Sequence, residues 1–152
     1  MLRFCRLDVA GALGAAVMTT AVLISAIMIS GGASAQNFTT AAEVRPILTA
    51  TKPNWIAVRE YDGQDLLYFT NLLAWRCGVT SLRYQVNGNE PVDLVIEPCH
   101  EDTAQPNALL METIQPYLTF PLASIATVTL EVTYDDASTD TATYERKSVL
   151  TP

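Results

Sequence analysis

Apolar and polar side chains alternate most regularly near the end of the chain. Over residues 127–134 every second residue is apolar, and residues 139–146 return with two further apolar positions at the same spacing. A period of two is typical of a β-strand with one face on a core and the other in solvent. The pattern therefore predicts a hairpin that turns over residues 135–138, with a core face made of Val128, Leu130, Val132, Tyr134, Ala142 and Tyr144.

Residues 82–86 and 92–96 alternate in the same way and predict a second hairpin. For Tyr84 to lie opposite Val92 on one face, the loop between the strands must hold an odd number of residues. We therefore predict a three-residue turn with Asn89 in the left-handed region, in preference to a two-residue Asn-Gly turn. The proline just before the second run lacks an N–H donor, which favours an edge position for that strand.

The pattern before these hairpins predicts one helix. Thr40 followed by Glu43 fits a capping box, which marks a helix start. Pro46 is the alternative start, because proline is favoured in the first helical turn. The helix must end before Pro53, since the residue before a proline is pushed out of the helical region.

Residues 55–61 predict a strand that returns over residues 66–70, with Asp62-Gly63 as the turn. The apolar run in the returning strand shows no alternation, which is typical of a central strand covered on both faces. Residues 71–76 fit either a short helical turn or a bent continuation of the strand.

The predicted elements add up to an α+β fold. One N-terminal helix packs on an antiparallel sheet of about six strands, built from successive hairpins. A small β-sandwich or roll is the alternative architecture.

The first 35 residues follow a different pattern. Arg3 and Arg6 are followed by an uncharged apolar run from residue 9 to residue 29, and Ala33-Ser34-Ala35 ends the segment. These are the three parts of a secretory signal, so we predict a cleaved signal peptide over residues 1–35 and a single globular periplasmic or secreted domain over residues 36–152. The alternative is a membrane anchor that stays uncleaved, because the run is just long enough to span a bilayer.

Charge narrows the choice of partners. The chain has 9 basic and 16 acidic residues and a formal net charge of −7. The predicted signal peptide carries two arginines and one aspartate, so the rest is more acidic still. We therefore expect no binding to nucleic acid and no membrane contact beyond the N-terminal segment.

Two cysteines lie outside the predicted signal peptide, Cys77 and Cys99. A single pair in an oxidising compartment predicts one disulfide. A redox pair or half a metal site is the alternative, but no C-x-x-C is present and the chain has one histidine.

The only histidine, His100, lies in an acidic loop with Glu97, Glu101 and Asp102. One imidazole among carboxylates could serve as a general base or a weak metal site. The simpler interpretation is a solvated polar loop beside the disulfide, since consecutive residues rarely converge on one metal. We predict no cofactor, because neither G-x-G-x-x-G nor a phosphate loop occurs.

Trp75 and Arg76 are the candidate binding residues, with Trp55 as a third. Tryptophan and arginine are enriched at interaction hot spots. The competing interpretation is that both tryptophans fill the core and that Arg76 pairs with an acid.

The segments Tyr68-Phe69-Thr70, Trp75-Arg76-Cys77-Gly78 and Tyr84-Gln85-Val86-Asn87-Gly88 resemble a group of small, uncharacterised exported proteins of Gram-negative bacteria. The resemblance covers most of residues 36–152. It implies a periplasmic location and carries no activity, cofactor or catalytic residue.

These observations lead to one main functional prediction. We expect a small exported domain, tied by a disulfide and non-catalytic, that binds a protein or an envelope component. The alternative is a small periplasmic hydrolase or metal-dependent enzyme that uses the acidic loop around His100.

Overall fold

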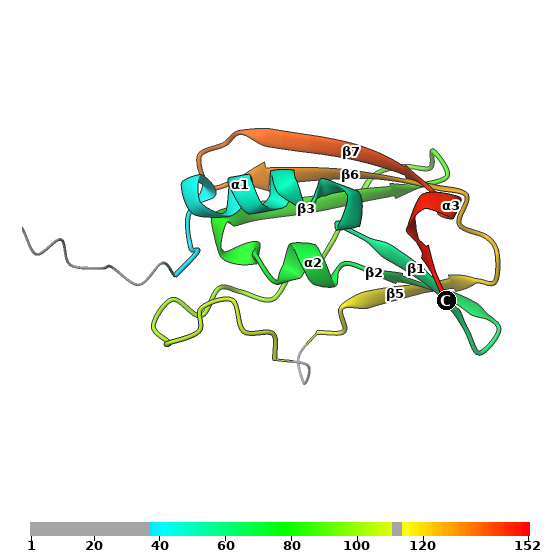
Figure 1. Cartoon of the computed structure of the whole chain (residues 1–152), viewed down its shortest axis with the longest axis horizontal. Helices are drawn as coiled ribbons and strands as arrows, with labels where there is room; N and C mark the ends of the chain where they lie inside the picture. The colour runs from blue at the N-terminus through cyan, green and yellow to red at the C-terminus, as the bar shows by residue number, and fades with distance from the viewer. Residues whose placement is uncertain (1–36, 111–113) are drawn as a thin grey trace, which may run out of the picture. The chain divides into compact units, whose positions relative to one another are not determined.

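The computed structural model describes residues 37–110 and 114–152 (Figure 1). The predicted signal peptide lies outside the described residues. The described helices are α1 (Ala41–Ala50), α2 (Thr70–Leu73) and α3 (Arg146–Val149), with 3-10 helices η1 (Lys52–Asn54) and η2 (Arg76–Gly78). The strands are β1 (Ala57–Tyr61), β2 (Gln64–Tyr68), β3 (Val79–Val86), β4 (Val92–Asp93), β5 (Tyr117–Pro121), β6 (Thr127–Tyr134), β7 (Thr139–Glu145) and β8 (Leu150–Thr151).

The strands form two sheets of four, ordered β5-β2-β1-β8 and β4-β3-β6-β7. All neighbours are antiparallel except β1 and β8. The prediction of a mixed helix-and-strand fold is confirmed, but the single sheet of about six strands, with one helix, is wrong. The reason lies between β2 and β3, where the short helices α2 and η2 carry the chain from the first sheet into the second.

The first hairpin has the predicted tight turn. Asp62 and Gly63 both have positive φ, 49° and 71°, and Tyr61 pairs with Gln64. Such a turn twists in the same sense as the strands that it joins. β2 is central in its sheet, between β1 and β5, as its unbroken apolar run predicts.

The second hairpin has the predicted register and a different turn. Tyr84 pairs with Val92, as expected. The residues with positive φ are Asn87 (53°) and Gly88 (74°), so the turn has two residues and the prediction of a left-handed Asn89 is wrong. A two-residue turn leaves one more residue between the turn and Val92 than between Tyr84 and the turn, and the irregular backbone before β4 accommodates it. β4 lies at the sheet edge, as the proline predicts.

Asn87 takes the left-handed conformation because its side chain is used in that position. Its Oδ1 accepts from the N–H groups of Ala126 (2.7 Å) and Thr127 (3.0 Å), and its Nδ2 donates to Ser124 O (2.7 Å). Asparagine tolerates positive φ better than most residues. The turn therefore also ties down the loop between β5 and β6.

The capping box predicts the start of α1 correctly. Thr40 and Glu43 cap each other, and the helix begins at Ala41, so Pro46 lies inside it rather than at its start. The buried face of α1 consists of Ala41, Val44 and Leu48. Figure 1 shows α1 lying along the sheet of β3, β6 and β7.

One hydrophobic core joins α1 and both sheets. The alternating positions predicted for β6 are all buried, since Val128, Leu130, Val132 and Tyr134 are each at most 1% exposed. The first sheet contributes Val58 and Leu67 to the same core. The core therefore holds in place the segment between the two sheets, which carries Trp75 and Arg76.

Candidate functional site

Trp55 lies in the core. Its side chain has 0% exposure, and its indole N–H donates to Leu48 O at 2.8 Å. A buried indole normally finds such a partner, because an unpaired N–H in the interior is costly. The position of Trp55 therefore matches the core interpretation of this residue.

Arg76 is also buried, with 2% exposure. Its guanidinium donates to backbone carbonyls, those of Leu73 (3.3 Å), Glu97 (2.7 Å), Pro98 (3.0 Å), Asn107 (2.8 Å) and Ala108 (2.9 Å). The carboxylate of Glu97 lies 4.0 Å from Nη2. Arginine suits this task because its planar group carries five N–H donors in a fixed arrangement. Its side chain is thus occupied in holding residues 97–108.

The predicted disulfide between Cys77 and Cys99 is present, with the two Cα atoms 4.9 Å apart. The disulfide attaches Cys99 to the residue after Arg76, so both Arg76 and the disulfide hold residues 97–108. Asn107 adds a third attachment, since its Oδ1 accepts from Cys77 N at 3.0 Å and its Nδ2 donates to Phe38 O at 2.9 Å. We call residues 97–108, held by Arg76, Asn107 and the disulfide, the anchored loop.

His100 lies in the anchored loop with its Nε2 2.7 Å from Oε1 of Glu97. Burial alone would raise the pKa of Glu97, but the N–H of Leu110, the His100 ring and the Arg76 charge together lower it below its ordinary value. Glu101 and Asp102 are exposed. In residues 37–110 and 114–152, no three His, Cys, Asp or Glu side chains come together as metal ligands could.

Trp75 differs from its neighbour because it is only partly buried and lies between two pockets. One pocket, of about 470 Å³, is lined by Asn54, Trp55, Ile56, Ala57, Tyr68, Thr70, Asn71, Ala74 and Trp75. The other, of about 360 Å³, is lined by Asn37, Phe38, Ala74, Trp75, Ala104, Gln105, Pro106, Asn107 and Ala108. We call the first the α2 pocket and the second the loop pocket.

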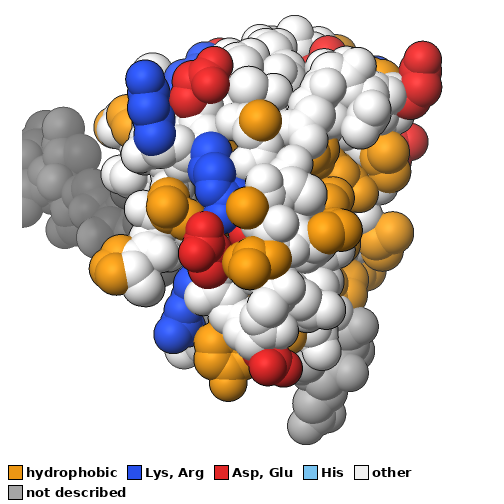
Figure 2. Space-filling model, turned by 90° about the vertical axis from the view of Figure 1, so that its right-hand side faces the viewer, with side chains coloured by type: hydrophobic (Ala, Val, Ile, Leu, Met, Phe, Trp, Pro, Cys, Tyr) orange, Lys and Arg blue, Asp and Glu red, His pale blue; other side chains and the backbone are white. Residues whose placement is uncertain are grey.

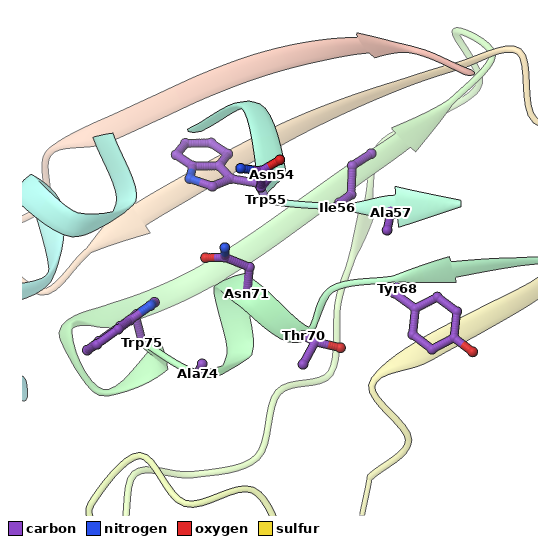
Figure 3. Close-up of a pocket in the computed structure, with 9 residues that line it drawn as sticks. All are labelled: Asn54, Trp55, Ile56, Ala57, Tyr68, Thr70, Asn71, Ala74 and Trp75. Carbon is purple, nitrogen blue, oxygen red and sulfur yellow. The ribbon is translucent and has the colours of Figure 1, made fainter. Parts of the chain in front are cut away.

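Figure 3 shows how three parts of the chain meet at the α2 pocket. Asn54 and Trp55 come from the end of η1, Tyr68 and Thr70 from the junction of β2 and α2, and Trp75 from the residue before η2. The side chain of Asn71 points toward Trp55 across the pocket. On its other side Trp75 meets the ring of Phe38 edge to face, with centroids 5.1 Å apart.

Sequence reasoning missed most of this pocket, including Asn54, Tyr68, Thr70 and Asn71. A signal for part of it was present. A two-residue turn at Asp62-Gly63 places Ala57 opposite Tyr68, and this pair is observed. The approach of Trp75 depends on the helical segment after β2, which the sequence left undecided.

Charge is distributed unevenly between the pockets and the rest of the surface. None of the residues that line the α2 pocket or the loop pocket is charged. Figure 2 shows a different face, the end of the molecule near the tip of the β1–β2 hairpin, where acidic, basic and hydrophobic side chains are interspersed. Among the described residues, the pockets beside Trp75 are thus neutral sites in an acidic chain.

Comparison with known proteins adds no relative. No protein-family model, no curated protein and no solved structure matches the chain. No helix in the described ranges is long and apolar enough to cross a membrane.

Proposed function

We propose that this chain is a small exported binding domain that recognises a protein or an envelope component through the surface around Trp75. The observation that carries the proposal is the position of Trp75, a partly exposed tryptophan that forms a wall of two neighbouring pockets. Tryptophan is one of the residue types that are enriched at interaction hot spots.

The surroundings of Trp75 support this role because they are fixed before any partner arrives. Its backbone N–H donates to Leu72 O at 3.1 Å. The next residue, Arg76, donates four hydrogen bonds to carbonyls of the anchored loop. A rigid site loses little conformational entropy on binding. The surface around Trp75 would therefore be preorganised for a partner.

Export is supported by two separate features. The N-terminal segment has the three parts of a secretory signal, and the Cys77–Cys99 disulfide is the kind of bond that persists in an oxidising compartment. The resemblance to small exported proteins of Gram-negative bacteria supports the periplasm in particular. The N-terminus of the purified protein tests this, because cleavage after Ala35 leaves Gln36 first.

The proposal is tested by cross-linking the tagged protein in its own cell envelope and identifying what is captured. Trp75→Ala is compared with Tyr61→Ala, which removes an aromatic side chain that is 60% exposed at the tip of the first hairpin. We expect the wild-type protein and Tyr61→Ala to capture the same partner, and Trp75→Ala to lose it. Equal capture by Trp75→Ala would show that the surface around Trp75 is not the binding site.

The pair of His100 and Glu97 favours one alternative function, that of a hydrolase. A histidine oriented by a buried carboxylate is how many hydrolases hold their general base. Metal content and hydrolysis of envelope substrates by the wild-type protein and His100→Ala test this alternative. An activity that disappears in His100→Ala would replace the binding proposal, whereas no turnover by either protein would remove the alternative.

A further inference from the structure

We infer that the α2 pocket takes one sugar unit of a neutral oligosaccharide, and that Trp75 separates this unit from the next one in the loop pocket. The inference rests on the proposed function and names its ligand class. It is carried by the chemistry of the side chains that line the two pockets.

The α2 pocket combines aromatic rings with uncharged hydrogen-bonding groups. Tyr68 and Trp75 supply partly exposed rings, and Asn54, Thr70 and Asn71 supply amide and hydroxyl groups. A sugar has the same mixed character, with C–H faces that pack on a ring and hydroxyl groups around its edge. An amide both donates and accepts, so it can bind two neighbouring hydroxyl groups at once.

The polar groups of this pocket are available to a ligand. Asn71 accepts a long hydrogen bond of 3.4 Å at Oδ1 from Thr51, and its Nδ2 donates to no other described residue. The side chains of Asn54 and Thr70 make no hydrogen bond within the described part of the chain, and both residues are exposed. These groups face water in the free protein and can exchange it for hydroxyl groups.

The loop pocket repeats this composition on the other side of Trp75. It has the aromatic ring of Phe38 and the amides of Asn37 and Gln105, again without a charged side chain. In a chain with 16% charged residues, two adjacent neutral pockets with the same kinds of side chain favour a ligand with repeating neutral units. A charged ligand would lack a counter-charge in either pocket.

The size of the α2 pocket agrees with a small ligand. Its volume of about 470 Å³ lies within the range of roughly 300–1,000 Å³ found for small-molecule sites.

The nearby cation Lys52 is already paired, with Nζ 3.0 Å from Oδ1 of Asp140. Recognition in this pocket would therefore depend on shape and on neutral hydrogen bonds.

The test uses protein produced from the full chain and two defined probes, maltotetraose and tetra-N-acetylchitotetraose. Binding is measured by calorimetry and by the NMR signals of the two indole N–H groups. Asn71→Ala alters the α2 pocket and Gln105→Ala the loop pocket, while Asn89→Ala removes an exposed amide outside both. We expect one of the probes to bind and to shift the Trp75 signal. Asn71→Ala and Gln105→Ala should each weaken binding about tenfold, whereas Asn89→Ala should leave it unchanged.

Three outcomes would overturn the inference. The first is no binding of either probe at about 10 mM, a concentration that reveals even very weak complexes. The second is binding that Trp75→Ala and Asn71→Ala leave unchanged. The third is capture of a protein that needs Trp75 while neither sugar binds, which would leave the proposed binding function standing and remove only the saccharide.

Discussion

Trp75 and Arg76 are adjacent in the sequence, and the structure gives them opposite environments. Trp75 is partly exposed between two pockets, whereas Arg76 is 2% exposed and surrounded by backbone carbonyls. Both belong to residue types that are common at interaction hot spots. The comparison shows that residue type alone does not identify a binding residue, because burial decides what the side chain can reach.

The two residues also depend on each other. The hydrogen bonds of Arg76 hold the anchored loop, and this loop provides residues 104–108 of the loop pocket on one side of Trp75. The buried residue thus shapes the surface beside the partly exposed Trp75. Substitutions at Arg76 should change stability, while substitutions at Trp75 should change binding.

The largest effect on stability is expected from Arg76→Ala. The substitution leaves Glu97 buried without its cation and removes the donors of five hydrogen bonds. Breaking a buried ion pair by removing one partner costs about 3–5 kcal/mol. Urea unfolding measures the loss. Arg83→Ala is the matched control, because Arg83 forms exposed ion pairs with Asp93 and Glu131 and should lose no more than about 1 kcal/mol. Equal losses in the two variants would contradict the structural role of Arg76.

The disulfide should rank second. Cys77 and Cys99 are 22 residues apart. Closing a loop of this length lowers the conformational entropy of the unfolded chain and so stabilises the fold by about 3 kcal/mol. We expect the double variant Cys77→Ser, Cys99→Ser to unfold at lower urea, and a reducing agent to lower the wild-type midpoint in the same way. Two thiols that react with an alkylating agent in the unreduced, denatured protein would contradict the bond itself.

Local patterns predicted α1 and the main hairpins of this fold, but not α3, β8 or how the hairpins combine. The cap of α1, the Asp62-Gly63 turn and the pairing of Tyr84 with Val92 all depend on residues close in sequence. The partner of β2 is β5, whose pairing of Leu66 with Thr119 joins segments that no local pattern connects. For this reason the main prediction was one sheet, and an arrangement with two sheets entered only through the alternative of a small sandwich or roll.

The candidate site was predictable to a similar extent. The sequence singled out Trp75 and both cysteines, and it left open whether Arg76 was a binding or a structural residue. Four of the five carbonyls that accept from Arg76 reach it only because the anchored loop folds back over it. A sequence pattern does not show which backbone carbonyls will come together in this way. The amides of Asn54 and Asn71 were missed for a related reason, since both come to line the α2 pocket only when β1 and β2 pair.

A third prediction concerns Asp65. Its charge is buried like that of Arg76, but its partner is the side chain of Arg146. Arg146 donates to both carboxylate oxygens of Asp65, at 2.6 and 2.8 Å. These hydrogen bonds lower the pKa of Asp65 to about 2. They outweigh burial, which would raise the pKa, and the N–H groups of Ile125 and Ala123 lower it further. A lowered pKa in the folded state means that the carboxylate stabilises the fold above about pH 4 and loses this effect as the pH falls toward 2.

The measurement for Asp65 is urea unfolding of the wild-type protein and of Asp65→Asn from pH 6 downward. We expect a stability difference on the order of 2 kcal/mol at pH 6 that shrinks between pH 4 and pH 2. Asp93→Asn serves as the control, because the side chain of Asp93 is 83% exposed and its loss should matter little. A difference that stays constant over this interval would contradict the lowered pKa.

The smallest effect on stability, and the largest on binding, is expected from Trp75→Ala. The substitution removes the edge-to-face contact with Phe38, which is worth about 1 kcal/mol, and the packing of a partly buried ring against the edge of the core. It leaves Arg76, the disulfide and the buried face of α1 in place. The protein should therefore unfold within about 1–2 kcal/mol of the wild type and still fail to capture its partner or bind a saccharide. A loss of stability as large as that of Arg76→Ala would mean that Trp75 belongs to the scaffold, and the contrast between the two neighbours would then disappear.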